Sequence, residues 1–396
     1  MVISKKYIVV APFGGEPKTS DFQIVEEDLP SLKDNEFLAQ AAYFSVDPYQ
    51  RVKLGNQFPC DMIGGQIAKV IESKNPNYPV GAWVMGHFGW RTYTNVNPAV
   101  SERSPQKPYL YVLPDFGNLP VSLGIGVCGR VGNTAYFGLT RICQPKPGET
   151  VVVSGAAGAV GSHVGQIAKI LGCKVIGIAG TDEKCKWLEN ELCFDSTYNY
   201  KNGNLADFLK EKAPNGVDCY FDNVGGELSN IVLSQMNEYG RIAVCGAISA
   251  YNAQNPLKAI IVQPMIVSKQ LRMEGFQVNR YANQTMEGIK QNLQWVEEGK
   301  LIYREHIWDG FESAPNAFIG EKWHNKKKLI DEEKIKLKKK EYEKKRNIET
   351  IDLQNDGTAV VSDSPYIATT GDYVLVKWGN EKYPGQVLSI FEDGQL

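Results

Sequence analysis

The feature that most limits how this chain can fold is a glycine run between an apolar stretch and a helical pattern. Residues 150–154 are largely β-branched and apolar, the run GAAGAVG fills 155–161, and an amphipathic pattern continues to residue 171. Glycines in a strand–loop–helix unit let the backbone approach a pyrophosphate, and the helix N-terminus offers N–H groups and the positive end of its dipole. Alone the run is weak evidence of a pyrophosphate-binding site, because a tight turn with close helix packing also needs glycines.

Strands and helices continue to alternate after this run. Strands are expected at 174–179, 218–222 and 240–245, and helices at 182–191, 205–213, 228–236 and 285–298. Continuous apolar strands that alternate with helices predict a parallel sheet covered on both faces. In that context the glycine run predicts a dinucleotide-binding domain over residues 128–300, with a Rossmann-type doubly wound sheet.

The chain before residue 128 has a different rhythm. Stretches rich in β-branched and aromatic residues, bounded by Gly, Pro and Asn, predict strands at 5–11, 37–45, 66–73 and 83–88. No βαβ alternation connects them, and residues 301–319 return to the same kind of pattern. We therefore predict an α/β protein whose second, β-rich domain is built from residues 1–127 and 301–330.

Composition limits the partners and the location. The 396 residues carry a net charge of −2, which gives no global electrostatic reason to expect nucleic acid or a membrane surface as partner. Residues 1–10 lack the core of a signal peptide, and no apolar run is long enough to span a bilayer, so we expect a cytoplasmic protein. The eight cysteines form no C-x-x-C pair, and no histidine lies at ligand spacing from a cysteine or another histidine. The sequence thus predicts reduced thiols and no metal site.

The end of the second strand of the parallel sheet indicates which dinucleotide binds. NAD sites usually place a carboxylate there, which accepts hydrogen bonds from the ribose 2′-hydroxyl. Here Gly180 and Thr181 end the strand, and Lys184 follows within one helical turn, where its ammonium could neutralise a 2′-phosphate. A surface lysine at the start of a helix is the alternative interpretation. The pattern favours NADPH.

Several segments together resemble one family. They are GAAGAVG (155–161), CKVIGIAGTDEK (173–184), DCYFDNVGGE (218–227), GRIAVCGAISAYN (240–252), SVDPYQR (45–51), AKVIESKN (68–75), NTAYFGL (133–139) and LRMEGFQV (271–278). They are similar to motifs of the prostaglandin reductase/leukotriene B4 12-hydroxydehydrogenase family of zinc-independent medium-chain reductases. The resemblance extends from residue 1 to about residue 320.

This resemblance implies a GroES-like catalytic domain, a Rossmann domain and usually a homodimer. It implies NADPH-dependent reduction of the C=C bond of enones and enals, such as 15-oxo-prostaglandins and lipid-derived 2-alkenals. The cofactor contacts that it implies are Gly155, Gly158, Ala159, Val160, Gly161, Lys184, Tyr200, Asn223, Cys245, Gly246, Ala247, Ile248, Ser249, Ala250, Tyr251, Phe276, Gln277, Val278 and Asn325.

Such a reaction needs hydrogen-bond donors at the carbonyl oxygen, because hydride addition to the β-carbon leaves negative charge there. Without a zinc ion, we predict Tyr251 and Tyr49 as the catalytic residues: Tyr251 follows a strand of the parallel sheet, and Tyr49 lies in the segment VDPY. Packing beside the cofactor is the alternative for Tyr251, and a turn fixed by Asp47 and Pro48 is the alternative for Tyr49. Arg51 could attract a carboxylated lipid or form a structural ion pair.

After Gly320 the chain departs from the family pattern. The glycine before the lysine of the family's Gly-x-Asn-x-Gly-Lys segment is absent, and the terminal strand is expected at 328–330 or lost, which would expose a sheet edge. Residues 331–346 hold eight Lys or Arg against five Asp or Glu, and predict a charged linker or helix. Residues 347–396 predict an acidic tail, partly disordered or a fragment of a small β module, with strand-like stretches at 373–376 and 386–391.

Two other functions remain open from the sequence. A quinone oxidoreductase of the same superfamily would share the cofactor loop. Alternatively, the altered C-terminus could leave an inactive NADPH-binding protein whose tail binds a partner. The segments VDPY and AISAYN favour the alkenal branch, so we predict a small-molecule enone or enal as the partner, and neither nucleic acid nor membrane.

Overall fold

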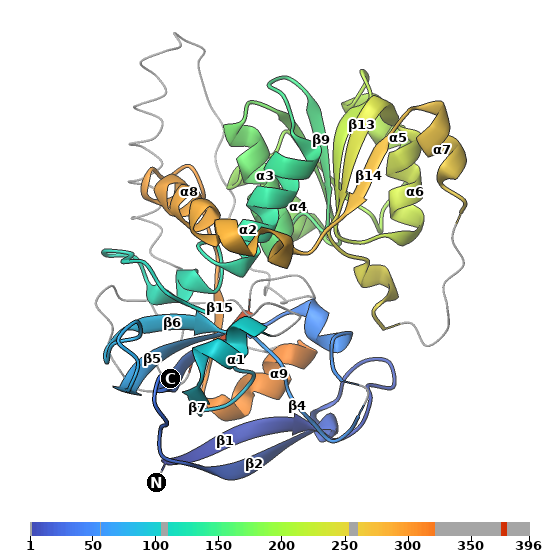
Figure 1. Ribbon diagram of the computed structural model, residues 1–396. Coiled ribbons are helices and arrows are strands. Elements are labelled where there is room, and N and C mark those ends of the chain that lie inside the picture. The colour runs from blue at the N-terminus through green and yellow to red at the C-terminus, as the bar shows by residue number, and fades with distance from the viewer. Residues whose placement is uncertain (1, 56, 104–109, 253–259, 321–373, 378–396) are drawn as a thin grey trace, which may run out of the picture.

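The computed structural model describes residues 2–55, 57–103, 110–252, 260–320 and 374–377. They form a parallel-sheet unit and a β-rich unit, which lie one above the other in Figure 1. The predicted α/β class, a Rossmann-type parallel sheet combined with a β-rich domain, is confirmed.

The parallel sheet has the strand order β11-β10-β9-β12-β13-β14, and every neighbouring pair is parallel. Its strands are β9 (Thr150–Ser154), β10 (Lys174–Ala179), β11 (Ser196–Asn199), β12 (Val217–Asp222), β13 (Met236–Val244) and β14 (Arg272–Gly275). Successive side chains of a strand point to opposite faces. Accordingly, Val151 and Val153 pack into one apolar cluster and Val152 into another. The apolar run of β9 is therefore buried on both faces.

Helices cover both faces of this sheet (Figure 1). Those that contribute side chains to the cluster of Val151 are α2 (Arg130–Phe137), α3 (Ala159–Ile170), α4 (Asp182–Asn190) and α8 (Thr285–Glu297). Those that contribute to the cluster of Val152 are α5 (Leu205–Lys212), α6 (Gly226–Ser234) and α7 (Gln263–Ser268). Shorter helical turns are η3 (Val121–Gly124), the π-helical turn η4 (Gly138–Cys143), η5 (Ile248–Ala250) and η6 (Val278–Gln284).

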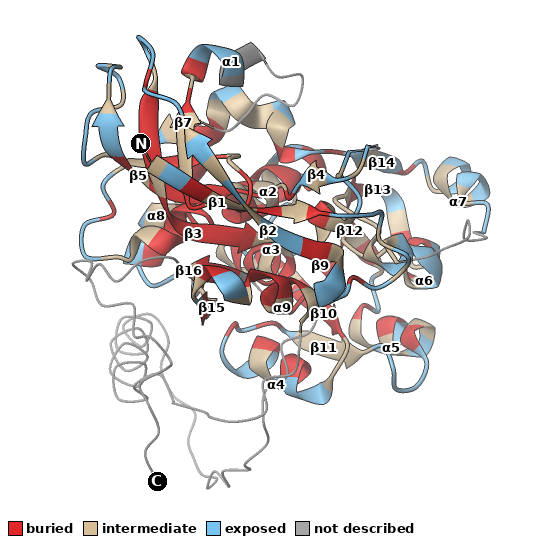
Figure 2. Ribbon diagram, turned by 90° about the horizontal axis from the view of Figure 1, so that it is seen from below, coloured by how far each residue is buried: buried red, intermediate tan, exposed pale blue. Residues whose placement is uncertain are grey.

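The β-rich unit contains a three-stranded sheet, β2-β1-β4, and a seven-stranded sheet with the order β15-β16-β3-β5-β6-β8, in which β7 also pairs with β3. Its strands are β1 (Val2–Val9), β2 (Phe22–Leu29), β3 (Phe37–Val46), β4 (Cys60–Asp61), β5 (Gln66–Ser73), β6 (Trp83–Gly86), β7 (Tyr93–Val96), β8 (Tyr111–Val112), β15 (His306–Asp309) and β16 (Val374–Lys377). Its helices and turns are η1 (Thr19–Asp21), η2 (Pro48–Arg51), α1 (Pro98–Arg103), η7 (Phe311–Ser313) and α9 (Ala314–Ile319). Figure 2 shows β3 buried along almost its whole length.

A strand from the tail completes this larger sheet. β16 lies between β15 and β3, parallel to the first and antiparallel to the second. Leu375 and Val376 are fully buried. The strand-like stretch expected at 373–376 is therefore observed as a strand at 374–377, and it covers one edge of β3. The expected strands at 328–330 and 386–391 and the charged segment 331–346 lie outside the described residues.

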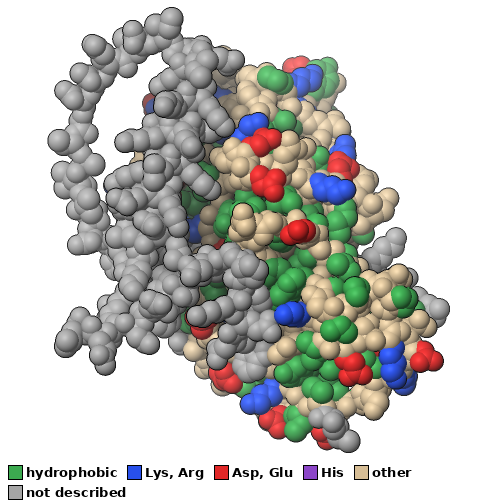
Figure 3. Space-filling model, turned by 90° about the vertical axis from the view of Figure 1, so that its left-hand side faces the viewer, with side chains coloured by type: hydrophobic (Ala, Val, Ile, Leu, Met, Phe, Trp, Pro, Cys, Tyr) green, Lys and Arg blue, Asp and Glu red, His purple; other side chains and the backbone are tan. Residues whose placement is uncertain are grey.

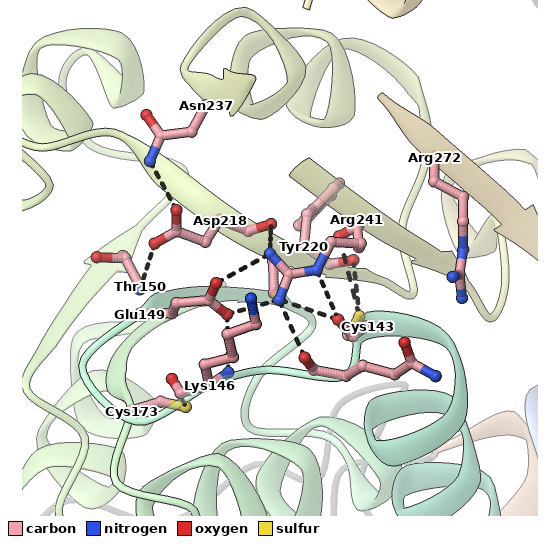
Figure 4. A network of polar contacts seen from close by, with 12 residues as sticks. Cys143, Lys146, Glu149, Thr150, Cys173, Asp218, Tyr220, Asn237, Arg241 and Arg272 are labelled. Carbon is pink, nitrogen blue, oxygen red and sulfur yellow. Dashed lines mark hydrogen bonds and ion pairs between the residues drawn. The ribbon is translucent and has the colours of Figure 1, made fainter. Parts of the chain in front are cut away.

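A polar network closes the amino-terminal edge of the parallel sheet (Figure 4). The Arg241 guanidinium forms an ion pair with Glu149, and its Nε donates to the carbonyl oxygen of Cys143 at 2.8 Å. Asp218 accepts hydrogen bonds from the backbone N–H of Thr150 at 2.8 Å and from the side-chain amide of Asn237 at 2.7 Å. These contacts tie neighbouring strands together at the edge opposite to the glycine run.

The visible outer surface carries charged side chains of both signs. On the face that Figure 3 leaves visible, acidic and basic side chains are interspersed. Within the described ranges, no helix is both long enough and apolar enough to cross a bilayer.

Candidate active site

The glycine run forms the turn between β9 and α3. Gly155 has φ of +59°, a region that residues with a side chain rarely adopt, and a Cβ on Gly161 would lie 2.3 Å from the carbonyl oxygen of Gly155. Gly158 is the N-cap of α3 and provides no side-chain hydrogen bond to the first turn. Since the first N–H groups of a helix have no intrahelical partner, those of Ala159, Val160 and Gly161 are directed out of the helix end, where an anion can bind.

The end of β10 is shaped by Tyr200 and by the start of α4. A Cβ on Gly180 would lie 3.1 Å from a ring carbon of Tyr200, so the tyrosine lies against this strand end. Thr181 caps α4 by accepting a hydrogen bond from the backbone N–H of Lys184 at 3.3 Å, and the Lys184 residue is only 7% exposed. Tyr200 and the helix turn that carries Lys184 are thus brought to the same strand end.

A buried carboxylate, which the sequence reasoning missed, fixes the neighbouring loop after β12. Asp222 Oδ1 accepts hydrogen bonds from the Ser154 hydroxyl at 3.0 Å, from the Tyr220 hydroxyl at 2.9 Å and from the backbone N–H groups of Val224 and Gly225. Its Oδ2 accepts from the Ser229 hydroxyl at 2.6 Å. Its signal in the sequence is an acid directly after the apolar residues that end a strand.

Asn223, the next residue, is held by β9. Its side-chain amide donates to the carbonyl oxygen of Ser154 at 2.8 Å, and its backbone N–H donates to the Ser154 hydroxyl at 2.9 Å. The strand ends of β9 and β12 therefore present Asn223 beside Gly155, whose added Cβ would lie 3.5 Å from the Cβ of Asn223.

The predicted cofactor loop 245–251 packs onto this turn. Ile248 N–H donates to the carbonyl oxygen of Asn223 at 3.2 Å, and the Ser249 hydroxyl donates to that of Val224 at 2.6 Å. The Tyr251 hydroxyl accepts from the backbone N–H of Ala247 at 3.4 Å, and a Cβ on Gly246 would lie 2.9 Å from it. Tyr251 thus folds back over its own loop at the carboxyl edge of the sheet.

The segment 276–278 meets this edge through its backbone. Phe276 and Val278 are 9% and 3% exposed and pack against Phe221 and Phe137, respectively. Their side chains belong to the core, so only their main-chain atoms can face a ligand. The neighbouring Gln277 is exposed.

Tyr49 enters the same region from the β-rich unit. It lies in η2, whose N-cap is Asp47. The hydroxyl of Tyr49 is buried and makes no hydrogen bond of normal geometry within the described part of the chain, although the Ser45 hydroxyl is close enough to lower its pKa. Burial, and then the charge of Asp47, raise the pKa of Tyr49. A protonated phenol is suited to donate a hydrogen bond to a ligand.

Arg130, also missed from the sequence, lies beside Tyr49. Its guanidinium is 5.2 Å from the centre of the Tyr49 ring, and its Nη1 lies 3.1 Å from both His87 Nε2 and Asn279 Oδ1. Asn279 directly follows the predicted cofactor residue Val278. The signal in the sequence is an arginine at the start of a helical pattern, directly after a glycine.

Arg51 joins the two units instead of facing a ligand. Its guanidinium donates to the side-chain oxygen of Asn252 at 3.2 Å and to the carbonyl oxygen of Phe318 at 3.3 Å. Asn252 follows the cofactor loop, whereas Phe318 belongs to α9. Of the two roles considered for Arg51, the structure favours a structural one, although its partners are neutral oxygens.

The structure thus brings most of the predicted residues to one edge of the parallel sheet. These are the glycine run, Asn223 and the loop 245–251, with Tyr49 added from the other unit. The predicted contact Asn325 lies outside the described residues. No group of three or more His, Cys, Asp or Glu side chains that could hold a metal ion occurs in the part of the chain that the structure describes.

Comparison with known proteins identifies the family. Residues 5–103 match a family model described as the N-terminal domain of oxidoreductase, and residues 159–297 match one described as zinc-binding dehydrogenase. Prostaglandin reductase 1 from Bos taurus is 47% identical over 323 residues, which cover 81% of this chain and 96% of that protein. The NADPH-dependent curcumin reductase of Escherichia coli is 36% identical over 80% of this chain and 93% of its own length.

A solved structure agrees with these relatives. The crystal structure of CurA in complex with NADPH from Vibrio vulnificus superposes with a TM-score of 0.74 at 30% identity, and covers 95% of this chain and 100% of that chain. The resemblance inferred from the sequence motifs is confirmed. The chain belongs to the prostaglandin reductase family, within the medium-chain dehydrogenase/reductase superfamily.

Proposed function

We propose that this protein uses NADPH to reduce the C=C bond of α,β-unsaturated ketones and aldehydes, with 15-oxo-prostaglandins and lipid-derived 2-alkenals as substrate classes. The names of its relatives support this activity: one is a prostaglandin reductase and another an NADPH-dependent curcumin reductase. The structural observation that carries the proposal is the uncapped first turn of α3, at the sheet edge to which Asn223 and the loop 245–251 also belong.

The residues at this edge fit a phosphorylated dinucleotide. The N–H groups of the first turn of α3 would bind the pyrophosphate, and Lys184 with Tyr200 would bind the 2′-phosphate at the end of β10. Asn223, the loop 245–251 and the main chain of 276–278 would hold the nicotinamide half. In this proposal residues 128–300 bind the cofactor, while residues 1–127 and 301–330 form the catalytic domain.

NADPH, when bound, supplies the hydride. The protein's own residues orient the enone and stabilise the negative charge that develops on its carbonyl oxygen. The Tyr251 hydroxyl accepts from Ala247 and so keeps its own proton to donate. The Tyr49 hydroxyl is buried and has a raised pKa, so it too remains a donor at neutral pH.

A turnover panel tests this proposal. The full-length protein is mixed with NADPH and, separately, with a series of 2-alkenals, a 15-oxo-prostaglandin and a benzoquinone, and the nicotinamide absorbance is followed. We expect NADPH consumption with the enals and the enone, and a product that has lost its C=C bond. Consumption with the quinone alone would favour a quinone oxidoreductase, and NADPH binding without any turnover would favour an inactive binding protein.

We also propose that the protein is a homodimer. Among the described residues β14 is an edge strand of the parallel sheet, and the segment that precedes it in the chain exposes apolar side chains: Val267 is 76% exposed and Ile261 72%. A strand edge and exposed apolar side chains are both features of surfaces that pair with a second copy. Light scattering after size-exclusion chromatography should give twice the mass of the chain; a monomer at micromolar concentration would contradict this.

A cytoplasmic location completes the proposal. All eight cysteines are free, which suits a reducing compartment. Subcellular fractionation should recover the protein with cytoplasmic markers, and recovery with a membrane or organelle fraction would contradict the assignment.

A further inference from the structure

The tail strand β16 lies beside the turn that carries Tyr49. Val46, the last residue of β3, pairs with Val374 of β16, and η2 begins two residues later. This turn contains both Tyr49 and Arg51. The part of the sheet that β16 completes is therefore the part from which the β-rich unit reaches the candidate active site.

β16 also supports α9. Gly310, which lies between β15 and η7, donates its backbone N–H to the carbonyl oxygen of Lys377 at 3.0 Å. The buried side chain of Val376 belongs to the same apolar cluster as Ala317 and Phe318 of α9. Figure 2 shows α9 beside β15 and β16, and α9 contacts β16 directly. The helix α9 thus packs on a strand that the tail supplies.

α9 in turn orients Arg51. The carbonyl oxygen of Phe318 accepts a hydrogen bond from Arg51 Nη2 at 3.3 Å, and the guanidinium carbon lies 5.4 Å from the centre of the Phe318 ring. Phe22 and Trp90 pack against the same ring. Burial lowers the pKa of Arg51, and the charge of Glu16 opposes this shift, so an acid of the same unit lies within reach of the guanidinium. Residues of the β-rich unit therefore fix the direction of this arginine.

A second hydrogen bond of Arg51 crosses to the cofactor loop, 245–251. Its Nη1 donates to Asn252 Oδ1 at 3.2 Å, and Asn252 directly follows Tyr251. The first residue of the loop is held by the parallel-sheet unit, since the backbone N–H of Cys245 donates to the carbonyl oxygen of Asp222 at 2.8 Å. The loop is therefore held at its start by one unit and just after its end by the other.

We propose that β16 is a positioning element of the active site: it supports α9, α9 orients Arg51, and Arg51 fixes the cofactor loop through Asn252. The assignment of this loop to the cofactor rests on the proposed function, whereas the chain of contacts does not. A loop that is already ordered loses less conformational entropy when a ligand binds. The tail therefore contributes to NADPH affinity as well as to the stability of the larger β-sheet.

Hydrogen exchange without any ligand tests the chain of contacts directly. Val376→Ala shortens the side chain that packs with α9, and Arg51→Met removes the hydrogen bonds to Phe318 and Asn252. In the full-length protein, each variant should speed amide exchange of residues 245–252 about fivefold. Because β16 acts through Arg51, the double variant should exchange no faster than Arg51→Met alone. A double-variant effect equal to the product of the two single effects would overturn the proposal.

Val84→Ala is the matched control. Val84 is a fully buried valine of β6 in the same sheet, and it belongs to a different apolar cluster from Val376. Its substitution should lower Tm as Val376→Ala does, but change exchange of residues 245–252 by less than about twofold. Equal acceleration by the two valine variants, or no acceleration by Val376→Ala, would overturn the role of β16. If Val376→Ala does not fold, Val376→Thr, which keeps the shape of the side chain, takes its place.

NADPH affinity separates this inference from the proposed function. The Kd, measured by nicotinamide fluorescence, should rise about tenfold in Arg51→Met and about threefold in Val376→Ala, and stay within about twofold in Val84→Ala. Faster exchange with an unchanged Kd in both of the first two variants would overturn the role of β16 in the active site. If the wild type binds no NADPH, the proposed function is wrong, and the exchange experiment alone decides whether β16 positions the loop.

Discussion

At Tyr251 the hydroxyl group can be tested without disturbing the packing of the ring. Because this hydroxyl only accepts a long hydrogen bond from Ala247 within its loop, Tyr251→Phe should leave the fold intact. We expect kcat/KM for a 2-alkenal to fall at least tenfold, which corresponds to about 1.4 kcal/mol of lost transition-state stabilisation. Steady-state kinetics provide the test: a fall of less than threefold would mean that Tyr251 is not the donor to the enolate.

Lys184 provides a residue-scale test of cofactor choice. Lys184→Glu places a carboxylate near the expected 2′-phosphate, so the KM for NADPH should rise more than tenfold, while the KM for NADH should change much less. Lys186→Glu is the matched control, since Lys186 lies on the same helix but is exposed. Equal effects on NADPH and NADH, or equal effects of the two variants, would contradict the role of Lys184.

Glu305 provides a pH-dependent prediction. Burial raises its pKa from 4.5 to about 7, and one of its oxygens accepts a hydrogen bond from the Ser122 hydroxyl at 2.9 Å. The folded protein therefore keeps a proton that the unfolded chain loses, so stability falls as pH rises from about 4.5 to about 7. Glu305→Gln should remove this loss and stabilise the protein by about 2 kcal/mol at pH 8, with little effect at pH 4.5. Urea unfolding at both pH values measures the difference, and a constant difference would contradict the prediction.

The sequence predicted the site residues that belong to a local pattern and missed those that depend on tertiary contacts. The glycine run and Lys184 have fixed spacings from a strand, so their place at the sheet edge follows from the order of elements. Asp222 and Arg130 are single polar residues with distant partners. Asp222 is hydrogen-bonded to Ser154, 68 positions away, and Arg130 to Asn279, 149 positions away. Nothing close to them in the chain indicates those contacts.

At the scale of elements, strands with a clear local pattern were predicted, and strands that depend on pairing with distant residues were missed. β9 and β10 were predicted with their observed bounds, because both are apolar runs buried on both faces. β2 was not predicted: its sequence FQIVEEDL contains three acids, and it becomes a strand by pairing along its whole length with β1. β14 was missed for a similar reason, since its four residues are largely exposed at the edge of the sheet.

β16 allows the contribution of the tail to be measured. Val376→Ala removes part of a fully buried side chain between β15 and β3, and we expect a loss of about 1.5–3 kcal/mol in the free energy of unfolding. Val80→Ala is the matched control: Val80 is 64% exposed, and its substitution should cost less than about 0.5 kcal/mol. Denaturant titration compares the two. Equal stabilities would mean that β16 is not part of the folded sheet.

At the scale of the whole molecule, a few polar contacts connect the two units across the candidate active site. Arg51 reaches Asn252 and Phe318, and Arg130 reaches His87 and Asn279. These contacts hold Tyr49, which comes from one unit, near the cofactor loop, which comes from the other. The division into two units could be predicted from the change in sequence rhythm, whereas the residues that join them could not.

The position of β16 has a consequence for the order in which the two sheets form during synthesis. β16 pairs with β3, and the paired residues are roughly 330 positions apart in the chain, so this contact is among the last to become available during translation. The parallel sheet can assemble as soon as β14 has emerged from the ribosome, while β3 and β15 lack this pairing partner until β16 has been made. These two strands are where a nascent chain would depend most on chaperones.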